Sequence, residues 1–244
     1  MNKITEALNL FKSNIKLFSA IVLTVWLPGS LICSYFDFYV FPEWANGDEM
    51  SFLKYSMRLS STIEFIVRPI YIGGLFYGAS QFQKGLAVSY QQAMTYSFRR
   101  SFKMLATSMM TNLIILGGTV LLIIPGVILA LRFALVDPVV VLEGTAGSQA
   151  RQRSTQLTQG RRWRIAGTMV LSGLVTILLM GIVSLVIYIP SGLMGLGESF
   201  IIHVIITVLT NIIAILPYLV IFCFYWESAE PINKVNKIKI SRYL

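Results

Sequence analysis

Five ionisable side chains fall inside apolar stretches of the sequence, where their types and spacing could support chemistry. They are Glu64, Arg68, Arg132, Asp137 and His203. A charged side chain at the centre of a membrane costs at least about 2.5 kcal/mol, so such residues are paired or functional. Glu64 and Arg68 are four residues apart with the acid first, the order that favours an ion pair on one helix face. The five could line a path for a solute, or they could hold helices together.

A second group of residues could bind phosphate. Five arginines lie between two apolar stretches: Arg151, Arg153, Arg161, Arg162 and Arg164. Guanidinium groups bind phosphate through two parallel hydrogen bonds, and each base near a membrane surface adds about 1 kcal/mol of attraction to anionic lipid. The alternative is that these arginines only set the topology and fix a helix end.

The same inventory argues against catalysis. One histidine and two cysteines, Cys33 and Cys223 in different apolar stretches, predict neither a zinc site nor a disulfide framework. Asp137 and Glu143 are six residues apart and do not share a helix face well, and no nucleophile has a base close by in the sequence. We therefore expect no enzyme activity, no cofactor and no metal.

The composition indicates that a lipid bilayer surrounds most of the chain. Of the 244 residues 55% are hydrophobic and 13% are charged, with a mean hydropathy of +0.71, whereas soluble domains carry about 25% charged residues. A net charge of +9 would suggest nucleic acid in a soluble protein, but here the bases lie beside apolar stretches. We expect an all-α, polytopic integral membrane helix bundle that binds no nucleic acid.

Hydropathy predicts about six membrane spans in a single domain over residues 1–244. The 103–142 stretch would be about 60 Å long as one helix, twice the thickness of the hydrocarbon layer, so we expect a break at Pro125-Gly126. The predicted segments are an interfacial helix at 1–16, spans at about 17–40, 62–82, 104–124, 127–142, 165–189 and 200–226, and a tail at 227–244.

The lysines and arginines predict the orientation of these spans. Sixteen of the twenty fall in the segments that lie on one side of the membrane together with both termini. The positive-inside rule places that side in the cytoplasm. Basic, helix-like stretches precede the first, third and fifth spans, which suggests three hairpin repeats, each led by a cytoplasmic interfacial helix. The alternative is that any helix entering a membrane from the cytoplasm carries bases.

The segment from Ile124 to Gly167 carries a recognisable pattern. Its elements are Pro125-Gly126, Arg132, Pro138, Glu143, Arg153-Ser154, Leu157, Gly160 and Trp163. The pattern resembles the membrane domain found fused to glycerophosphoryl diester phosphodiesterases and the related YciC-type bacterial inner-membrane proteins. The resemblance implies a multi-pass helical protein of the bacterial inner membrane. It does not carry over phosphodiesterase activity, because that activity needs a soluble domain with metal-binding acids and histidines that we do not find in this sequence.

These observations favour a non-enzymatic membrane protein whose basic cytoplasmic segments bind anionic lipid headgroups, with a scaffold role in maintaining the membrane or envelope. The alternative is a transporter or channel for a small solute or lipid, with the intramembrane charges along its path. The sequence does not identify a protein partner.

Overall fold

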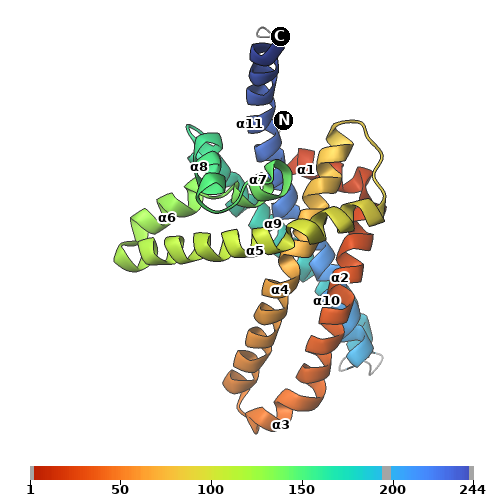
Figure 1. Ribbon diagram of the computed structural model, residues 1–244. Helices are drawn as coiled ribbons and strands as arrows, with labels where there is room; N and C mark the ends of the chain where they lie inside the picture. Colours follow the sequence, from red (N-terminus) through yellow and green to blue (C-terminus); the bar gives the residue numbers. More distant parts are fainter. Residues whose placement is uncertain (1–2, 194–198, 242–244) are drawn as a thin grey trace.

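The computed structural model describes residues 3–193 and 199–241, and every regular element in these residues is helical (Figure 1). In chain order the helices are α1 (Lys3–Ser13), α2 (Ile15–Tyr35), a π-helix (Phe36–Val40), α3 (Phe41–Ala45), α4 (Glu49–Gln83), α5 (Tyr90–Leu121), α6 (Ile123–Arg132), α7 (Val136–Glu143), α8 (Gly147–Thr158), α9 (Arg162–Leu193), α10 (Phe200–Ile213) and α11 (Leu216–Ser241). Five segments of this described chain are long and apolar enough to cross a membrane. The prediction of an all-α membrane bundle is confirmed.

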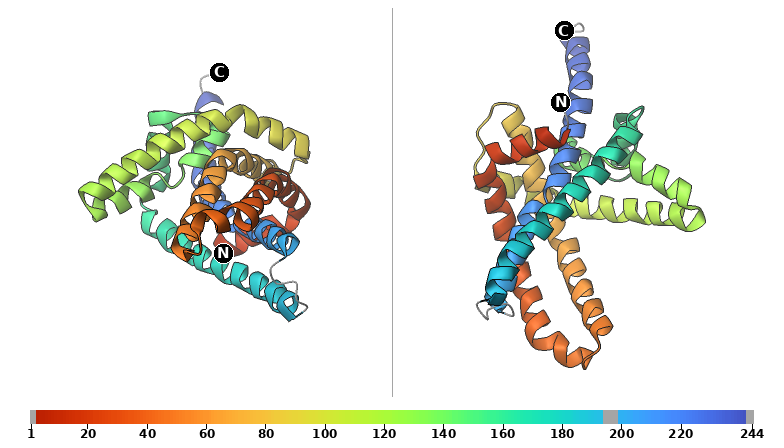
Figure 2. Two further views of the ribbon diagram at one scale, coloured as in Figure 1. Left: turned by 90° about the horizontal axis from the view of Figure 1, so that it is seen from below. Right: turned by 180° about the vertical axis from the view of Figure 1, so that it is seen from behind.

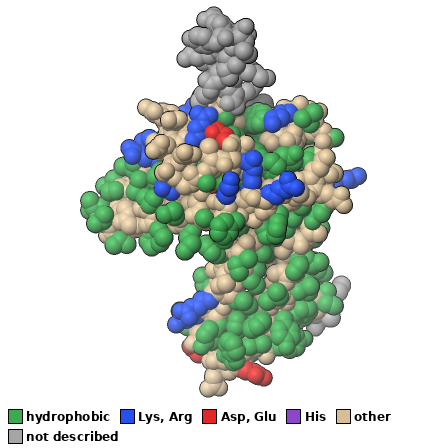
Figure 3. Space-filling view, viewed as in Figure 1, with side chains coloured by type: hydrophobic (Ala, Val, Ile, Leu, Met, Phe, Trp, Pro, Cys, Tyr) green, Lys and Arg blue, Asp and Glu red, His purple; other side chains and the backbone are tan. Residues whose placement is uncertain are grey.

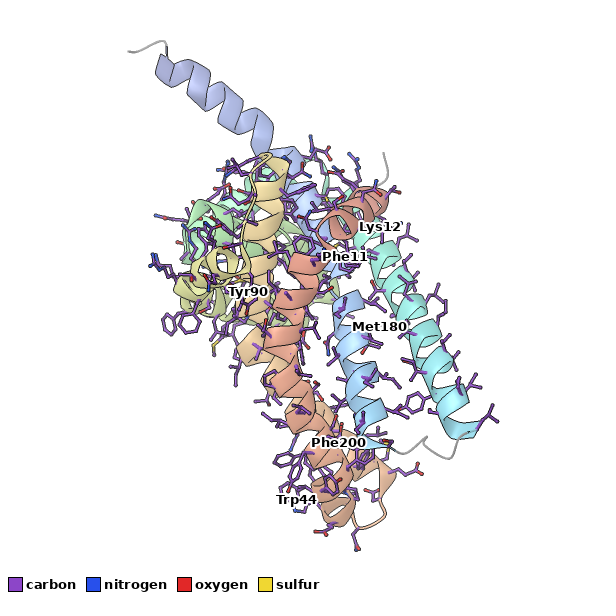
Figure 4. All side chains as sticks on the ribbon, turned by 90° about the vertical axis from the view of Figure 1, so that its right-hand side faces the viewer. Phe11, Lys12, Trp44, Tyr90, Met180 and Phe200 are labelled. Atoms are coloured by element: carbon purple, nitrogen blue, oxygen red, sulfur yellow. The ribbon has the colours of Figure 1, made fainter. Side chains whose placement is uncertain are left out.

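Helices α2 and α4 form a long hairpin that α3 closes at its far end (Figure 1). The Asp48 carboxylate begins α4 by accepting hydrogen bonds from the backbone N–H groups of Met50 and Ser51. Gly29 lets the two helices approach, because a Cβ there would lie 2.9 Å from Ile63 Cγ2. Helix α10 packs along α2 (Figure 4). The same view places Lys12 and Trp44 at opposite ends of the molecule; we call the Lys12 end the basic end.

Helices α5 and α6 form a second hairpin with a different direction. It projects sideways from the bundle, crosswise to the α2–α4 hairpin, in the front and rear views (Figures 1 and 2). The chain turns at Leu122, whose backbone is extended. The predicted break therefore exists, but it lies three residues before Pro125.

Proline explains the position of this break and of two others. Pro125, Pro138 and Pro217 each lie in the first turn of a helix, where the missing N–H breaks no hydrogen bond. Continuing the preceding helix through a proline would remove a hydrogen bond and cause a clash, which favours a break before each of these three. Pro28, Pro69 and Pro190, by contrast, lie inside α2, α4 and α9.

The segments predicted as spans at 127–142 and 200–226 consequently each consist of two helices, α6 with α7 and α10 with α11. Both segments remain long and apolar enough to cross a membrane, as Ile123–Glu143 and Phe200–Ala229.

Two of the other predicted boundaries also differ from the structure. Helix α4 begins at Glu49, well before the expected span at 62–82, and α5 runs unbroken from Tyr90, so no separate interfacial helix precedes the third span. Distinct helices do precede α2 and α9, namely α1 and α8. The repeat is thus irregular. Of the predicted tail, 227–241 continues α11, and 242–244 lie outside the described residues.

The main core lies toward the basic end, where α1, α2, α4, α7, α8 and α11 meet. Its largest fully buried side chains include Phe18, Phe76, Leu135, Phe222 and Phe224. Helix α1 packs against α11, so its apolar residues Ile4, Ala7 and Leu10 are buried in protein. An interfacial helix would place the apolar side chains of Ile4, Leu8, Phe11 and Ile15 in lipid. That prediction is wrong for α1, because Ile4 is buried and Leu8 and Phe11 pack against the core, while Ile15, the first residue of α2, is exposed.

Small residues allow helices α5 and α6 to pack in close contact within their hairpin. A Cβ on Gly126 would lie 2.7 Å from the Cα of Thr119, so Gly126→Ala must push the two helices apart. We expect a loss of about 1 kcal/mol in the free energy of unfolding, measured by thermal unfolding in detergent. Gly117→Ala is the matched control, because nothing lies within 4 Å of a Cβ there. Equal melting temperatures for the two variants would contradict this close packing.

Candidate functional site

Arg68 and Asp137 form an ion pair between two helices. Arg68 Nη2 on α4 lies 3.3 Å from Asp137 Oδ2 on α7. The Ser108 hydroxyl on α5 donates a hydrogen bond of 2.9 Å to the other carboxylate oxygen. The guanidinium also lies over the ring of Tyr218 on α11, 5.4 Å from its centroid. A single ion pair thus connects four helices.

The helical pair predicted between Glu64 and Arg68 is not formed. Within the described residues no basic atom lies within 4 Å of the Glu64 carboxylate, although its charge acts on Arg68 from a longer distance. A pair between residues four apart on a helix gains only about 0.2–0.5 kcal/mol. Tertiary packing brings Asp137, with an 18% exposed side chain, against Arg68 instead.

The other two intramembrane residues lie apart from this pair. His203 Nδ1 on α10 is 2.8 Å from the Ser34 hydroxyl oxygen on α2, and its ring meets that of Phe38 edge-on at 5.6 Å. The side chain of Arg132 is exposed at the end of α6. Of the five predicted residues, the structure therefore brings only Arg68 and Asp137 into contact.

A pocket of about 180 Å³ with polar and apolar walls lies beside the pair, between α4, α5, α6, α7 and α11. Its lining includes both charges together with Ser108, Thr111 and Asn112 of α5. The volume holds several water molecules or a small polar group. Because a cation and an anion face it together, the pocket suits a neutral or zwitterionic occupant better than a single ion.

Side chains of helix α8 form hydrogen bonds with the backbone groups that are left open where the chain breaks between α6 and α7. The buried Ser154 hydroxyl accepts a hydrogen bond of 3.1 Å from the Leu135 N–H and donates one of 2.8 Å to the Arg132 carbonyl. Thr158 donates to the same carbonyl at 3.3 Å. Backbone groups without partners in an apolar setting are costly. The serine of the Arg-Ser element in the sequence pattern thus binds the backbone at the junction between α6 and α7.

The arginine of that element is also bound within the protein. Arg153 Nε lies 3.0 and 2.9 Å from the two carboxylate oxygens of Glu143, at the end of α7. The Tyr225 hydroxyl of α11 donates to the same carboxylate at 3.2 Å. This network fixes α8 and α11 against α7.

Glu227 on α11 forms ion pairs with three further basic side chains at the basic end. Its carboxylate lies 2.9 Å from Lys3 Nζ, 3.1 Å from Arg161 Nη1 and 3.5 Å from Arg164 Nη1. Lys3 also pairs with Glu6 at 2.7 Å. Burial alone would lower the pKa of Lys3, but its hydrogen bonds to these two glutamates and their charges raise it above the usual value.

Three of the five arginines expected to bind headgroups therefore already pair with an acid: Arg153, Arg161 and Arg164. The other two are different. Within the described part of the chain, Arg151 Nη1 and Arg162 Nε are buried nitrogens without a hydrogen-bond partner. Of this set, Arg151 and Arg162 are the two that form no ion pair within the described residues.

Sequence reasoning missed the residues that close the end of α7. The Tyr96 hydroxyl and Arg100 Nη1, both on α5, donate to the Val141 carbonyl at 2.9 and 2.6 Å. Gly144 follows in the left-handed region with φ of 76°. A glycine directly after an apolar run predicts a helix end. Nothing in the neighbouring sequence shows that the side chains which donate to the last carbonyls of this helix lie about 40 residues earlier.

The family model for the membrane domain of glycerophosphoryl diester phosphodiesterase matches residues 103–242, more than half of the chain. The chain belongs to this membrane-domain family. The match covers the membrane domain and not the catalytic phosphodiesterase domain. Comparisons with curated proteins and with solved structures give no match.

The membrane-domain match begins inside α5 and includes the acids Asp137, Glu143 and Glu227. Two of their partners, Arg68 and Lys3, precede it. The ion pairs of these two bases therefore join the matched segment to helices α1 and α4, which the family match does not include.

Proposed function

We propose that this member of the membrane-domain family is a non-enzymatic protein of the bacterial inner membrane, with its basic end in the cytoplasm. It binds anionic lipid headgroups there and serves as a scaffold in membrane or envelope maintenance. The family match and the apolar helices support the integral membrane location.

A set of exposed bases without acidic partners carries the proposal. Figure 3 shows lysine and arginine side chains gathered across the basic end, above a mainly hydrophobic surface. Among the described residues, the exposed bases in no ion pair at or near this end are Lys12, Lys16, Lys84, Arg99, Lys103 and Arg132. Unpaired bases beside an apolar surface attract anionic headgroups by about 1 kcal/mol each.

A lipid-dependence measurement tests this function. The protein is placed in vesicles of phosphatidylcholine with or without phosphatidylglycerol, and its thermal unfolding is followed. We expect the anionic lipid to raise the melting temperature of the wild type, and the triple variant Lys84→Gln/Arg99→Gln/Lys103→Gln to lose most of that increase. The attraction removed is about 3 kcal/mol at low salt, and the increase should shrink as salt is added.

The matched control neutralises two exposed bases at the opposite end, Lys54 and Arg58. Lys54→Gln/Arg58→Gln should keep the response to phosphatidylglycerol. A wild type that responds equally to both lipid compositions would overturn the proposal.

The pocket beside Arg68 and Asp137 favours a second candidate function, the transport of a small solute or lipid. A pocket between helices that is lined by charged and polar side chains is the kind of site that transporters use. This function requires Arg68 for activity rather than for folding, a difference that is tested below.

A further inference from the structure

The α5–α6 hairpin presents an unusually apolar surface. From residue 104 to 131 the sequence contains no charged side chain. The turn is the most exposed part, with relative exposures of 78% for Val120, 81% for Leu121, 67% for Leu122 and 74% for both Ile123 and Ile124. Water is an unfavourable surrounding for such a continuous apolar surface, which must be covered by lipid or protein.

The base of the hairpin is rigidly attached. Helices α4 and α5 cross where Gly73 faces Ser97 so closely that no Cβ would fit, and the Ser97 hydroxyl donates to the carbonyls of Pro69 and Ile70. Farther along α5, the Thr107 hydroxyl accepts a hydrogen bond of 3.0 Å from the backbone N–H that begins α8. The direction of α5 is therefore set by its contacts with α4 and α8, and the rest of the hairpin follows it.

The level of this attachment can be compared with the thickness of a bilayer. Gly73 lies ten residues before Gln83, the last residue of α4 at the basic end. Ten helical residues span about 15 Å, which is half of the hydrocarbon thickness of about 30 Å. From that level α5 and α6 run crosswise to the α2–α4 hairpin (Figures 1 and 2). If α2 and α4 cross the bilayer, the α5–α6 hairpin lies along it.

We propose that the α5–α6 hairpin does not cross the membrane but lies within the leaflet at the basic end, with residues 120–124 in contact with acyl chains. Exposed bases flank the uncharged segment, Lys103 before it and Arg132 after it, and long basic side chains reach the headgroup region from such positions. The chemistry of the covering partner is thus hydrocarbon beneath anionic or zwitterionic headgroups. The inference does not depend on the scaffold role proposed above.

Cysteine labelling from the water phase separates the two topologies. A hairpin that crosses the membrane places Leu122 on the side of Asp48, whereas a hairpin in the leaflet places it in hydrocarbon. The native cysteines, Cys33 and Cys223, are both buried, so the wild type serves as the blank. With a membrane-impermeant maleimide applied from the side that labels Asp48→Cys, we expect no labelling of Leu122→Cys above the blank. Labelling of Leu122→Cys from either side would overturn the proposal.

A second measurement identifies what covers the turn. A nitroxide on Leu122→Cys, in vesicles of phosphatidylcholine and phosphatidylglycerol, should collide several-fold more often with oxygen than with a water-soluble nickel chelate. The nitroxide on Gln156→Cys, an exposed position of α8, should show the reverse. Low collision rates with both reagents at Leu122 would mean that a second copy or another protein covers it, and would overturn lipid as the partner.

Discussion

Replacing Asp137 by Leu is expected to lower the free energy of unfolding by about 2–3 kcal/mol, because it leaves the Arg68 guanidinium without its anion. Removing one partner of a fully buried pair costs about 3–5 kcal/mol. The Arg68 side chain is 37% exposed here, so we expect less than the full amount. The measurement is the amount of folded protein in the membrane, together with its melting temperature in detergent.

The double variant Arg68→Gln/Asp137→Leu should recover most of this loss, since no unpaired charge then remains. Glu64→Gln is the control on the same helix and should change stability by less than about 0.5 kcal/mol. If Arg68→Gln and Asp137→Leu both accumulate normally, fail to complement a deletion strain and are not rescued by the double variant, the transport function is favoured instead.

Ser154→Ala is expected to cost about 2 kcal/mol, because it leaves the Leu135 N–H without its partner and removes one of two donors to the Arg132 carbonyl. The site is fully buried, so water cannot readily replace the hydroxyl. Thermal unfolding in detergent measures the effect. Ser148→Ala, at an exposed position of the same helix, should stay within about 0.5 kcal/mol of wild type. Equal melting temperatures would show that the α6–α7 junction does not depend on this hydroxyl.

Hydropathy and proline carried most of the information about the fold. The length of the apolar stretches predicted an integral membrane protein. Pro125-Gly126 correctly indicated a break in the 103–142 stretch. Pro138 and Pro217 also follow breaks, each in the first turn of a helix. Proline alone would not have located these breaks, because Pro28, Pro69 and Pro190 lie inside α2, α4 and α9. The direction of α5 was not predictable in this way, since periodicity reports which face is apolar and not where the helix axis points.

The site was less predictable because its partners are distant in sequence. Arg68 pairs with a residue 69 positions away, whereas local spacing offered Glu64. The sequence has no acid between residues 147 and 164, where the five arginines lie. After folding, Glu143 and Glu227 nevertheless pair with three of them. Charge counts along the chain predict a topology, but only the tertiary structure shows which charges are already paired within the protein.

The packing of α1 on α11 has a consequence for biosynthesis. The Lys3–Glu227 ion pair and the buried side chains of Ile4 and Leu10 join the first described helix to the last. During translation α1 leaves the ribosome long before its docking surface exists, so its apolar face stays unprotected until α11 is inserted. Insertion of α11 and burial of α1 therefore coincide. A product that stops before α11 would keep that face open to chaperones and proteases, and the cell could recognise it as incomplete.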